Sequence, residues 1–194
     1  MKIGIAGYGF VGKAHEGVLK DYHDIIIYDP AGWKMLSHAF PDKQMTFSPE
    51  FLRAATAIED FRNNDTILLG GGNTGFWADI FVTAMGKINI NIAEAQELIL
   101  AKYARNSFLA LKVAYFNQLY DLCNKLNIDY EQVRKYTIID DRIGESHTTI
   151  TEERGFGGHC FPKDVNALIA TAKRDNVDLS ILKDAVEYNR NIRK

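Results

Sequence analysis

Lys2-Ile-Gly-Ile-Ala-Gly7-Tyr-Gly9-Phe-Val-Gly12 is the stretch of sequence that decides the fold. A short apolar run that ends in glycines is typical of a buried parallel strand, and residues 11–20 continue with a helical pattern. A second apolar run, Ile25–Tyr28, ends at Asp29. Strand, helix and strand within about thirty residues predict a βαβ unit.

The glycines of this stretch suit a bound dinucleotide. Gly7 permits a tight turn, Gly9 lets a pyrophosphate approach the backbone, and Gly12 lets helix and strand pack closely. The phosphates would lie at the helix N-terminus, with Phe10-Val11 in its first turn. Asp29 would accept hydrogen bonds from the ribose and repel a 2′-phosphate, which favours NAD over NADP. The alternative is a purely structural glycine turn, with Asp29 an ordinary strand-ending residue.

Bulk composition narrows the class of protein. Hydrophobic residues make up 46% of the 194 residues, charged residues 25%, and the formal net charge is −2. These values are ordinary for a soluble globular protein and give no reason to expect nucleic acid as a partner. No apolar stretch approaches the ~20 residues that span a bilayer, and the N-terminal run is too short for a signal peptide. With two cysteines and no disulfide framework, we expect a cytoplasmic protein without a metal site.

Hydrophobic periodicity divides the chain near residue 92. Residues 93–126 contain no glycine or proline, and their helical spacing predicts one long helix of about 50 Å at ~1.5 Å per residue. The predicted fold class is α/β: a reduced Rossmann-type parallel sheet over residues 1–92, followed by an α-helical domain over 93–194 built on this helix. The expected strands are 2–6, 25–28, 45–47, 66–69 and 88–92, and the expected helices are 11–20, 74–85, 93–126, 129–135, 163–174 and 179–190, with a further helix start at Ser48-Pro-Glu50.

Cys160 lies in Gly155-Phe-Gly-Gly-His-Cys160-Phe-Pro-Lys-Asp164, a segment too rich in glycine for a core helix. The glycines allow close approach of a substrate, and a helix N-terminus just after the cysteine favours a thiolate. Asp164 would lie one turn further along. Cys123, on the apolar stripe of the long helix, is interpreted as structural. A dyad of Cys160 with His159 stays open, although adjacent side chains usually diverge.

Four segments together resemble the UDP-glucose/GDP-mannose dehydrogenase family. Besides the cysteine loop, they are Ser48-Pro-Glu-Phe-Leu-Arg53, Lys102-Tyr-Ala-Arg-Asn106-Ser-Phe-Leu-Ala110 and Asp140-Asp-Arg-Ile-Gly144, the last being more like the UDP-glucose branch. From spacing alone, Lys102 and Asn106 share only one helix face. The resemblance extends over most of the chain from residue 45 onward.

The resemblance implies oxidation of a sugar C6 alcohol to a carboxylate with two NAD, through a thioester on Cys160. Lys102 and Asn106 would stabilise charge on the C6 oxygen. Asp164 would orient water or Lys102, and Glu50 would assist thioester hydrolysis or contact the sugar. The substrate, UDP-glucose by this resemblance, would also contact Phe51, Leu52, Arg53 and Gly157, and the enzyme would form a homodimer through the helix 93–126.

The sequence also departs from the family pattern. Only a short segment separates Asp29 from Ser48, where the family has several strands and helices, and Ala54 stands where the family commonly has a glutamate. The family's second α/β domain is expected to be absent after Lys194. Three hypotheses follow: an active minimal dehydrogenase, a catalytically impaired dimerising relative that serves as a binding module, and a nicotinamide-dependent oxidoreductase with a smaller substrate.

Overall fold

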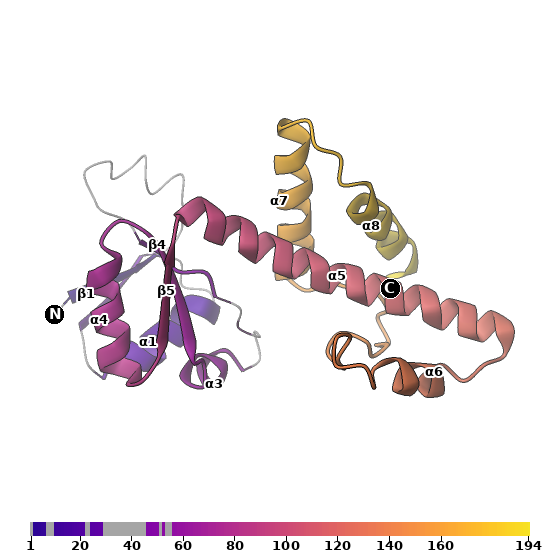
Figure 1. Cartoon of the computed structure of the whole chain (residues 1–194), viewed down its shortest axis with the longest axis horizontal. Coiled ribbons are helices and arrows are strands. Elements are labelled where there is room, and N and C mark those ends of the chain that lie inside the picture. The colour runs from indigo at the N-terminus through magenta and orange to yellow at the C-terminus, as the bar shows by residue number, and fades with distance from the viewer. Residues whose placement is uncertain (1, 7–9, 22–23, 29–45, 51, 53–55) are drawn as a thin grey trace. The chain divides into compact units, whose positions relative to one another are not determined.

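The computed structural model describes residues 2–6, 10–21, 24–28, 46–50, 52 and 56–194. The chain forms two compact units, Met1–Lys102 and Tyr103–Lys194, each of which is described by itself (Figure 1). The fold is a Rossmann-type α/β arrangement in the first unit, followed by helices in the second, which confirms the predicted fold class.

The first unit begins with the predicted βαβ elements. Strand β1 (Lys2–Ala6), helix α1 (Phe10–Leu19) and strand β2 (Asp24–Tyr28) follow in order. The two strands pair in parallel from Lys2↔Asp24 to Ala6↔Tyr28. The described strand, helix and strand have the order that the sequence predicts.

A second sheet completes this unit, and it is mixed rather than purely parallel. Strands β4 and β5 are parallel, whereas the two-residue strand β3 pairs antiparallel with β4. The elements in chain order are β3 (Thr46–Phe47), α3 (Ala57–Arg62), β4 (Thr66–Gly71), α4 (Thr74–Met85) and β5 (Asn89–Ala93).

The predicted helix start at Ser48 is wrong. Residues 48–50 are not helical, and the next described helix, α3, begins at Ala57 after the cap residue Thr56. The Ser48 hydroxyl lies 3.5 Å from the Glu50 carboxylate and so donates to a side chain instead of capping a helix. The Ser-Pro-Glu pattern therefore reflects a local side-chain contact.

The core of the first unit lies between its helices and strand β4. Phe61, Ile67, Leu69 and Phe81 are each at most 2% exposed and pack with Ala14 of α1. Each large apolar side chain buried in this way contributes about 1.5–3 kcal/mol of transfer free energy. This cluster joins α1 and α4 to the mixed sheet.

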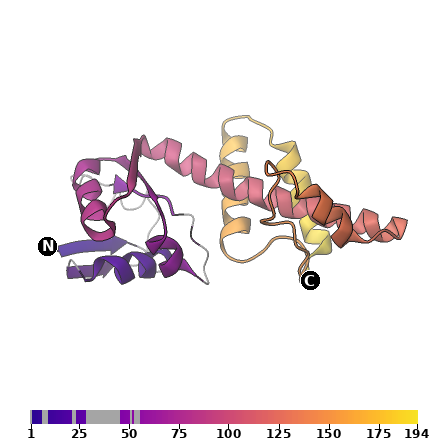
Figure 2. The ribbon, with the colours of Figure 1, turned by 60° about the horizontal axis from the view of Figure 1, so that its bottom comes forward.

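The second unit is helical and is assembled on the long helix α5 (Ala95–Leu126). Helices α7 (Cys160–Arg174) and α8 (Ser180–Ile192) lie beside it in both ribbon views (Figures 1 and 2). Ala110 and Ala114 of α5 form a core with Phe156, Val165 and Leu182. Helix α6 (Tyr130–Thr137) packs on the other half of α5 through Phe116 and Cys123.

The division between the units falls inside α5, ten residues after the boundary predicted at 92/93. The secondary structure does change there, because β5 ends at Ala93. However, a Cβ on Gly70 of β4 would lie 2.9 Å from the Cα of Ala95, so the start of α5 packs against the first unit. Within the described residues, no helix has the length and apolar character needed to cross a membrane.

Candidate active site

Cys160 is the first residue of α7, three residues earlier than the predicted helix start at Lys163. Pro162 lies in the first turn, where its missing N–H costs no intrahelical hydrogen bond. The Cys160 thiol is half-buried and free, whereas Cys123 is 3% exposed within the core. A half-buried thiol beside the free N–H groups of a helix start is a placement that suits a nucleophile.

Asp164 lies one turn further along α7 and is fully buried. Its Oδ2 accepts a hydrogen bond of 2.6 Å from the Asn106 amide of α5, and its Oδ1 pairs with the ammonium of Lys163. Two expected site residues, 58 positions apart, are thus in direct contact. The Asp164 carboxyl group is therefore held by donors from both α5 and α7, one helical turn along the chain from Cys160.

The glycine loop before Cys160 is anchored by α8. Asn189 accepts from the Phe156 N–H at 2.6 Å and donates to the Phe156 carbonyl at 2.9 Å. Gly155 has a φ of 57°, and a Cβ there would lie 2.2 Å from Asn189 Oδ1. A Cβ on Gly157 would lie 2.1 Å from the guanidinium of Arg193. Packing and its left-handed backbone therefore require Gly155, whereas the flexible end of the Arg193 side chain can move to make room at Gly157.

A second loop, over residues 138–150, is fixed to α5 by Lys112. The Lys112 ammonium donates to the carbonyls of Ile143 and Gly144 at 2.6 and 3.1 Å. Partial burial lowers the pKa of Lys112. The His147 ring lies 5.6 Å from the ring of Phe161, and desolvation and the Lys112 cation lower the pKa of His147. This loop is therefore in contact with the residue next to Cys160.

Glu50 is buried in the first unit, where its Oε1 lies 3.0 Å from the Nε2 of His15. The His15 ring in turn packs on Phe61, with ring centroids 4.5 Å apart. Leu52 is half-buried against the same core. The structure thus joins Glu50 to α1, a contact that the sequence did not predict.

Comparison with known proteins identifies the family. Residues 94–191 match the central domain of the UDP-glucose/GDP-mannose dehydrogenase family. This match covers half of the chain. The chain belongs to the UDP-glucose/GDP-mannose dehydrogenase family. Its relatives include the UDP-glucose 6-dehydrogenases of Rickettsia conorii, 38% identical over 147 residues, and of Rhizobium meliloti, 34% identical over 158 residues. The alignments cover 74% and 77% of this chain but only 33% and 35% of those proteins.

Solved structures agree with the family assignment. A UDP-glucose dehydrogenase from Pyrobaculum islandicum matches 98% of this chain and 50% of its own, with a TM-score of 0.74 and 25% identity. A 3-hydroxyisobutyrate dehydrogenase from Mycobacterium tuberculosis matches 98% of this chain and 93% of its own, with a TM-score of 0.71. Its identity is only 12%, so it supports the Rossmann-type fold alone.

The remaining family positions are only partly described. Phe10, Val11 and Gly12 lie in the first turn of α1. Lys102 is half-buried on α5, four residues before Asn106, which keeps both on one helix face. Among the described residues, His159 makes no side-chain hydrogen bond to Cys160, and it precedes Cys160 as the cap residue of α7. Gly7, Gly9, Asp29, Phe51 and Arg53 lie outside the described residues.

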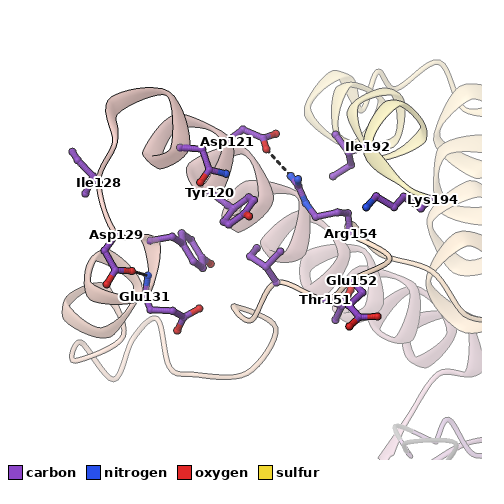
Figure 3. A pocket seen from close by; sticks show the side chains of 13 residues that line it. Tyr120, Asp121, Ile128, Asp129, Glu131, Thr151, Glu152, Arg154, Ile192 and Lys194 are labelled. Carbon is purple, nitrogen blue, oxygen red and sulfur yellow. Dashed lines mark hydrogen bonds and ion pairs between the residues drawn. The ribbon is translucent and has the colours of Figure 1, made fainter.

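Sequence reasoning missed a polar network beside the family's cysteine loop. Arg154 pairs with Asp121 at 2.7 Å and borders a pocket of about 680 Å³ (Figure 3). Tyr120 and Tyr130 also line this pocket, and Cys160 does not. The sequence feature that could have indicated this network is Asn117, a polar residue on the apolar stripe of α5. The structure leaves Asn117 only 1% exposed. Within the described ranges, no group of three acidic, histidine or cysteine residues is arranged to bind a metal ion.

Proposed function

We propose that this chain carries the catalytic apparatus for NAD-dependent oxidation of a nucleotide-sugar C6 alcohol to a carboxylate, with UDP-glucose giving UDP-glucuronate. The observation that carries the proposal is the hydrogen bond between Asn106 and Asp164, one turn from Cys160 at the start of α7. Family membership and the names of the relatives support it. The chain spans about one third of the length of these relatives.

Cys160 acts as the nucleophile. After the C6 alcohol has lost a hydride and a proton, the thiolate adds to the aldehyde carbon and the carbonyl oxygen takes up a proton, giving a thiohemiacetal. Loss of a second hydride and a proton gives a thioester. Water then cleaves the C–S bond, releasing the carboxylate and restoring the thiol. NAD, when bound, would supply the hydride acceptor for each of the two oxidations, one NAD molecule per hydride.

Charge on the C6 oxygen needs donors, and α5 supplies them. Asn106 offers an amide N–H, whose orientation is fixed by Asp164 at 2.6 Å. Lys102 would add a cation from the same helix face. Preorganised donors of this kind are typically worth about 3–4 kcal/mol in the transition state. Asp164 also orients water for thioester hydrolysis, and Glu50 contributes to hydrolysis or to sugar binding together with Phe51, Leu52, Arg53 and Gly157.

The cofactor site is proposed at the end of strand β1. The parallel pair β1–β2 and the start of α1 at Phe10 support this proposal, because a dinucleotide pyrophosphate binds between such a strand and a helix N-terminus. Gly7, Gly9, Phe10, Val11 and Gly12 would bind the pyrophosphate, and Asp29 the ribose. We place the reaction in the cytoplasm, where free thiols such as those of Cys123 and Cys160 persist.

A second copy of the chain is the proposed partner, packed along the long helix predicted over residues 93–126. Phe108, Tyr115 and Leu122 are 67%, 59% and 53% exposed on α5. They recur every seven residues, so they lie close to one face of the helix. This stripe also suits the alternative function, a dimerising relative without turnover.

The test measures NADH and UDP-glucuronate formed from UDP-glucose. We expect two NADH per product, and a loss of at least about a thousandfold in Cys160→Ser, because the second oxidation needs the acyl carrier. Cys123→Ala is the matched control and should keep its turnover. Iodoacetamide should also alkylate Cys160 faster than Cys123 in the native protein. Equal inactivity of the wild type and Cys160→Ser, with a dimer still present, would instead support the non-catalytic alternative.

A further inference from the structure

The cysteine loop begins with two consecutive residues of left-handed backbone. Arg154 has a φ of 58° and Gly155 a φ of 57°. Glycine adopts this region freely, but an arginine adopts it only when its surroundings hold it there. The contacts of the Arg154 side chain therefore decide the path of the backbone toward Cys160.

The Arg154 guanidinium contacts three residues of α5. Its Nε donates to Asn117 Oδ1 at 2.7 Å. Its Nη2 donates to Asp121 Oδ1 at 2.7 Å (Figure 3). The guanidinium also lies over the ring of Tyr120, 4.8 Å from its centroid. The planar fork of arginine can make these contacts together, whereas a lysine ammonium cannot.

Asn117 connects the side chain of Arg154 to the loop backbone. The same Oδ1 that accepts from Arg154 also accepts from the Gly155 N–H at 3.2 Å. The Asn117 amide nitrogen donates to the Val113 carbonyl at 2.9 Å, which fixes the side chain in the helix. Because Asn117 is buried, a loss of these partners could not be replaced freely by water.

Two residues from α8 and its C-cap also contact the network. Tyr188 donates to the second oxygen of Asp121 at 2.6 Å, and Arg193 donates to the Arg154 carbonyl at 3.0 Å. Phe156, the next residue after Gly155, is held by Asn189. The loop is thus fixed at two successive residues, four to five positions before Cys160.

We propose that Arg154 is a positioning residue for the nucleophile: by bridging Asn117 and Asp121 of α5, it fixes the loop that places Cys160 at the start of α7. In the part of the chain that the structure describes, its side chain contacts Asn117, Asp121 and Tyr120 and makes no hydrogen bond to Cys160. The proposal rests on the proposed function of Cys160. Misplacing a reacting group by about 1 Å can cost on the order of a hundredfold in rate.

The test replaces Arg154 with glycine, which keeps the left-handed backbone and removes only the side chain. Arg154→Lys is the second variant, because it keeps the charge and is the less disruptive change. The matched control is Arg174→Ala, which removes an exposed arginine paired with its neighbour Asp175. Because Arg154 borders the pocket, added ethylguanidine can reach the vacated site.

Three measurements are made on each variant: hydrogen exchange over residues 155–160, alkylation of Cys160 at pH 7, and kcat and KM with UDP-glucose. In Arg154→Gly we expect faster exchange, alkylation slowed about fivefold because the first turn of α7 frays, and kcat reduced at least about tenfold with KM changed less. The values for Arg154→Lys should lie between those of the wild type and those of Arg154→Gly. Ethylguanidine should restore all three in Arg154→Gly, and Arg174→Ala should match the wild type.

The outcomes separate this proposal from the proposed function. Unchanged exchange and alkylation in both Arg154 variants overturn the positioning role, whatever the turnover. The same holds if the exchange rate rises while alkylation and kcat stay at wild-type values. A wild type without turnover refutes the proposed function, and exchange and alkylation then decide the positioning role. Should Arg154→Gly not fold, wild-type behaviour of Arg154→Lys would equally count against it.

Discussion

Each unit of the chain buries one carboxylate of the expected site, and the two carboxylates have different partners. Glu50 meets the imidazole of His15, which packs on the aromatic ring of Phe61. Asp164 meets the amide of Asn106 and the ammonium of Lys163. One acid is therefore part of an aromatic core, and the other joins two helices beside a thiol.

The difference lies in the hydrogen-bonding roles of the partners. Either nitrogen of an imidazole can donate or accept a hydrogen bond, and one of them contacts one oxygen of Glu50. The Lys163 ammonium and the Asn106 amide N–H can only donate. Asp164 thus faces two donors, one at each of its carboxylate oxygens.

The largest expected effect is that of Asp164→Asn. An asparagine at position 164 offers only one oxygen to two donors, so its own amide nitrogen would face either Asn106 or Lys163. Two buried donors that face each other without an acceptor should lower the free energy of unfolding by about 3 kcal/mol. Urea unfolding measures the loss. Lys163→Met is the control and should cost less than about 1 kcal/mol, because the lysine side chain is 51% exposed.

A second buried titratable group extends the comparison within the second unit. Tyr130 donates to the Thr148 carbonyl at 2.5 Å, and burial, aided by the Glu131 charge, raises the pKa of Tyr130 to about 12. A raised pKa favours the neutral phenol in the folded state. Its stabilisation is complete below pH 10, the ordinary pKa of tyrosine, and is lost as the pH rises through about 12.

Raising the pH from 10 to about 12 should therefore lower the free energy of unfolding of the second unit by about 2 kcal/mol through Tyr130 alone. Tyr130→Phe should be less stable at pH 8, because it loses the hydrogen bond to Thr148, and the stability difference from the wild type should shrink as the pH rises. The measurement is the free energy of unfolding of both proteins at several pH values. A constant difference up to pH 11.5 would contradict the raised pKa.

The smallest expected effect is that of Glu50→Gln. The amide oxygen of glutamine can still accept from His15, so the contact itself is kept. We expect a loss of less than about 1 kcal/mol in unfolding free energy. Urea unfolding of Glu50→Gln beside Asp164→Asn is the direct comparison. Equal losses in the two variants would show that burial alone, and not the partner, determines what each carboxylate contributes.

Local pattern determined much of the fold. Strand 2–6 and helix 74–85 have the predicted bounds, because each rests on apolar periodicity within one segment. The helix predicted over 93–126 begins two residues later, at Ala95. Where side-chain chemistry competes with periodicity, prediction failed: Ser48 donates to Glu50 instead of starting a helix. The helix after the glycine loop was predicted to begin at Lys163 and begins three residues earlier, at Cys160. A proline in the first turn is compatible with more than one first residue of a helix.

What the sequence by itself determined is the cysteine loop, the long helix and the family that they resemble. Tertiary structure alone decided the partners: Asn106 for Asp164, His15 for Glu50, and Asn117 for Arg154. Each of these pairs joins residues more than thirty positions apart, and hydrophobic periodicity carries no information on which polar groups meet when two elements pack. The physical reason is that a buried polar side chain must find a partner, but the fold, and not the local sequence, decides which one is near.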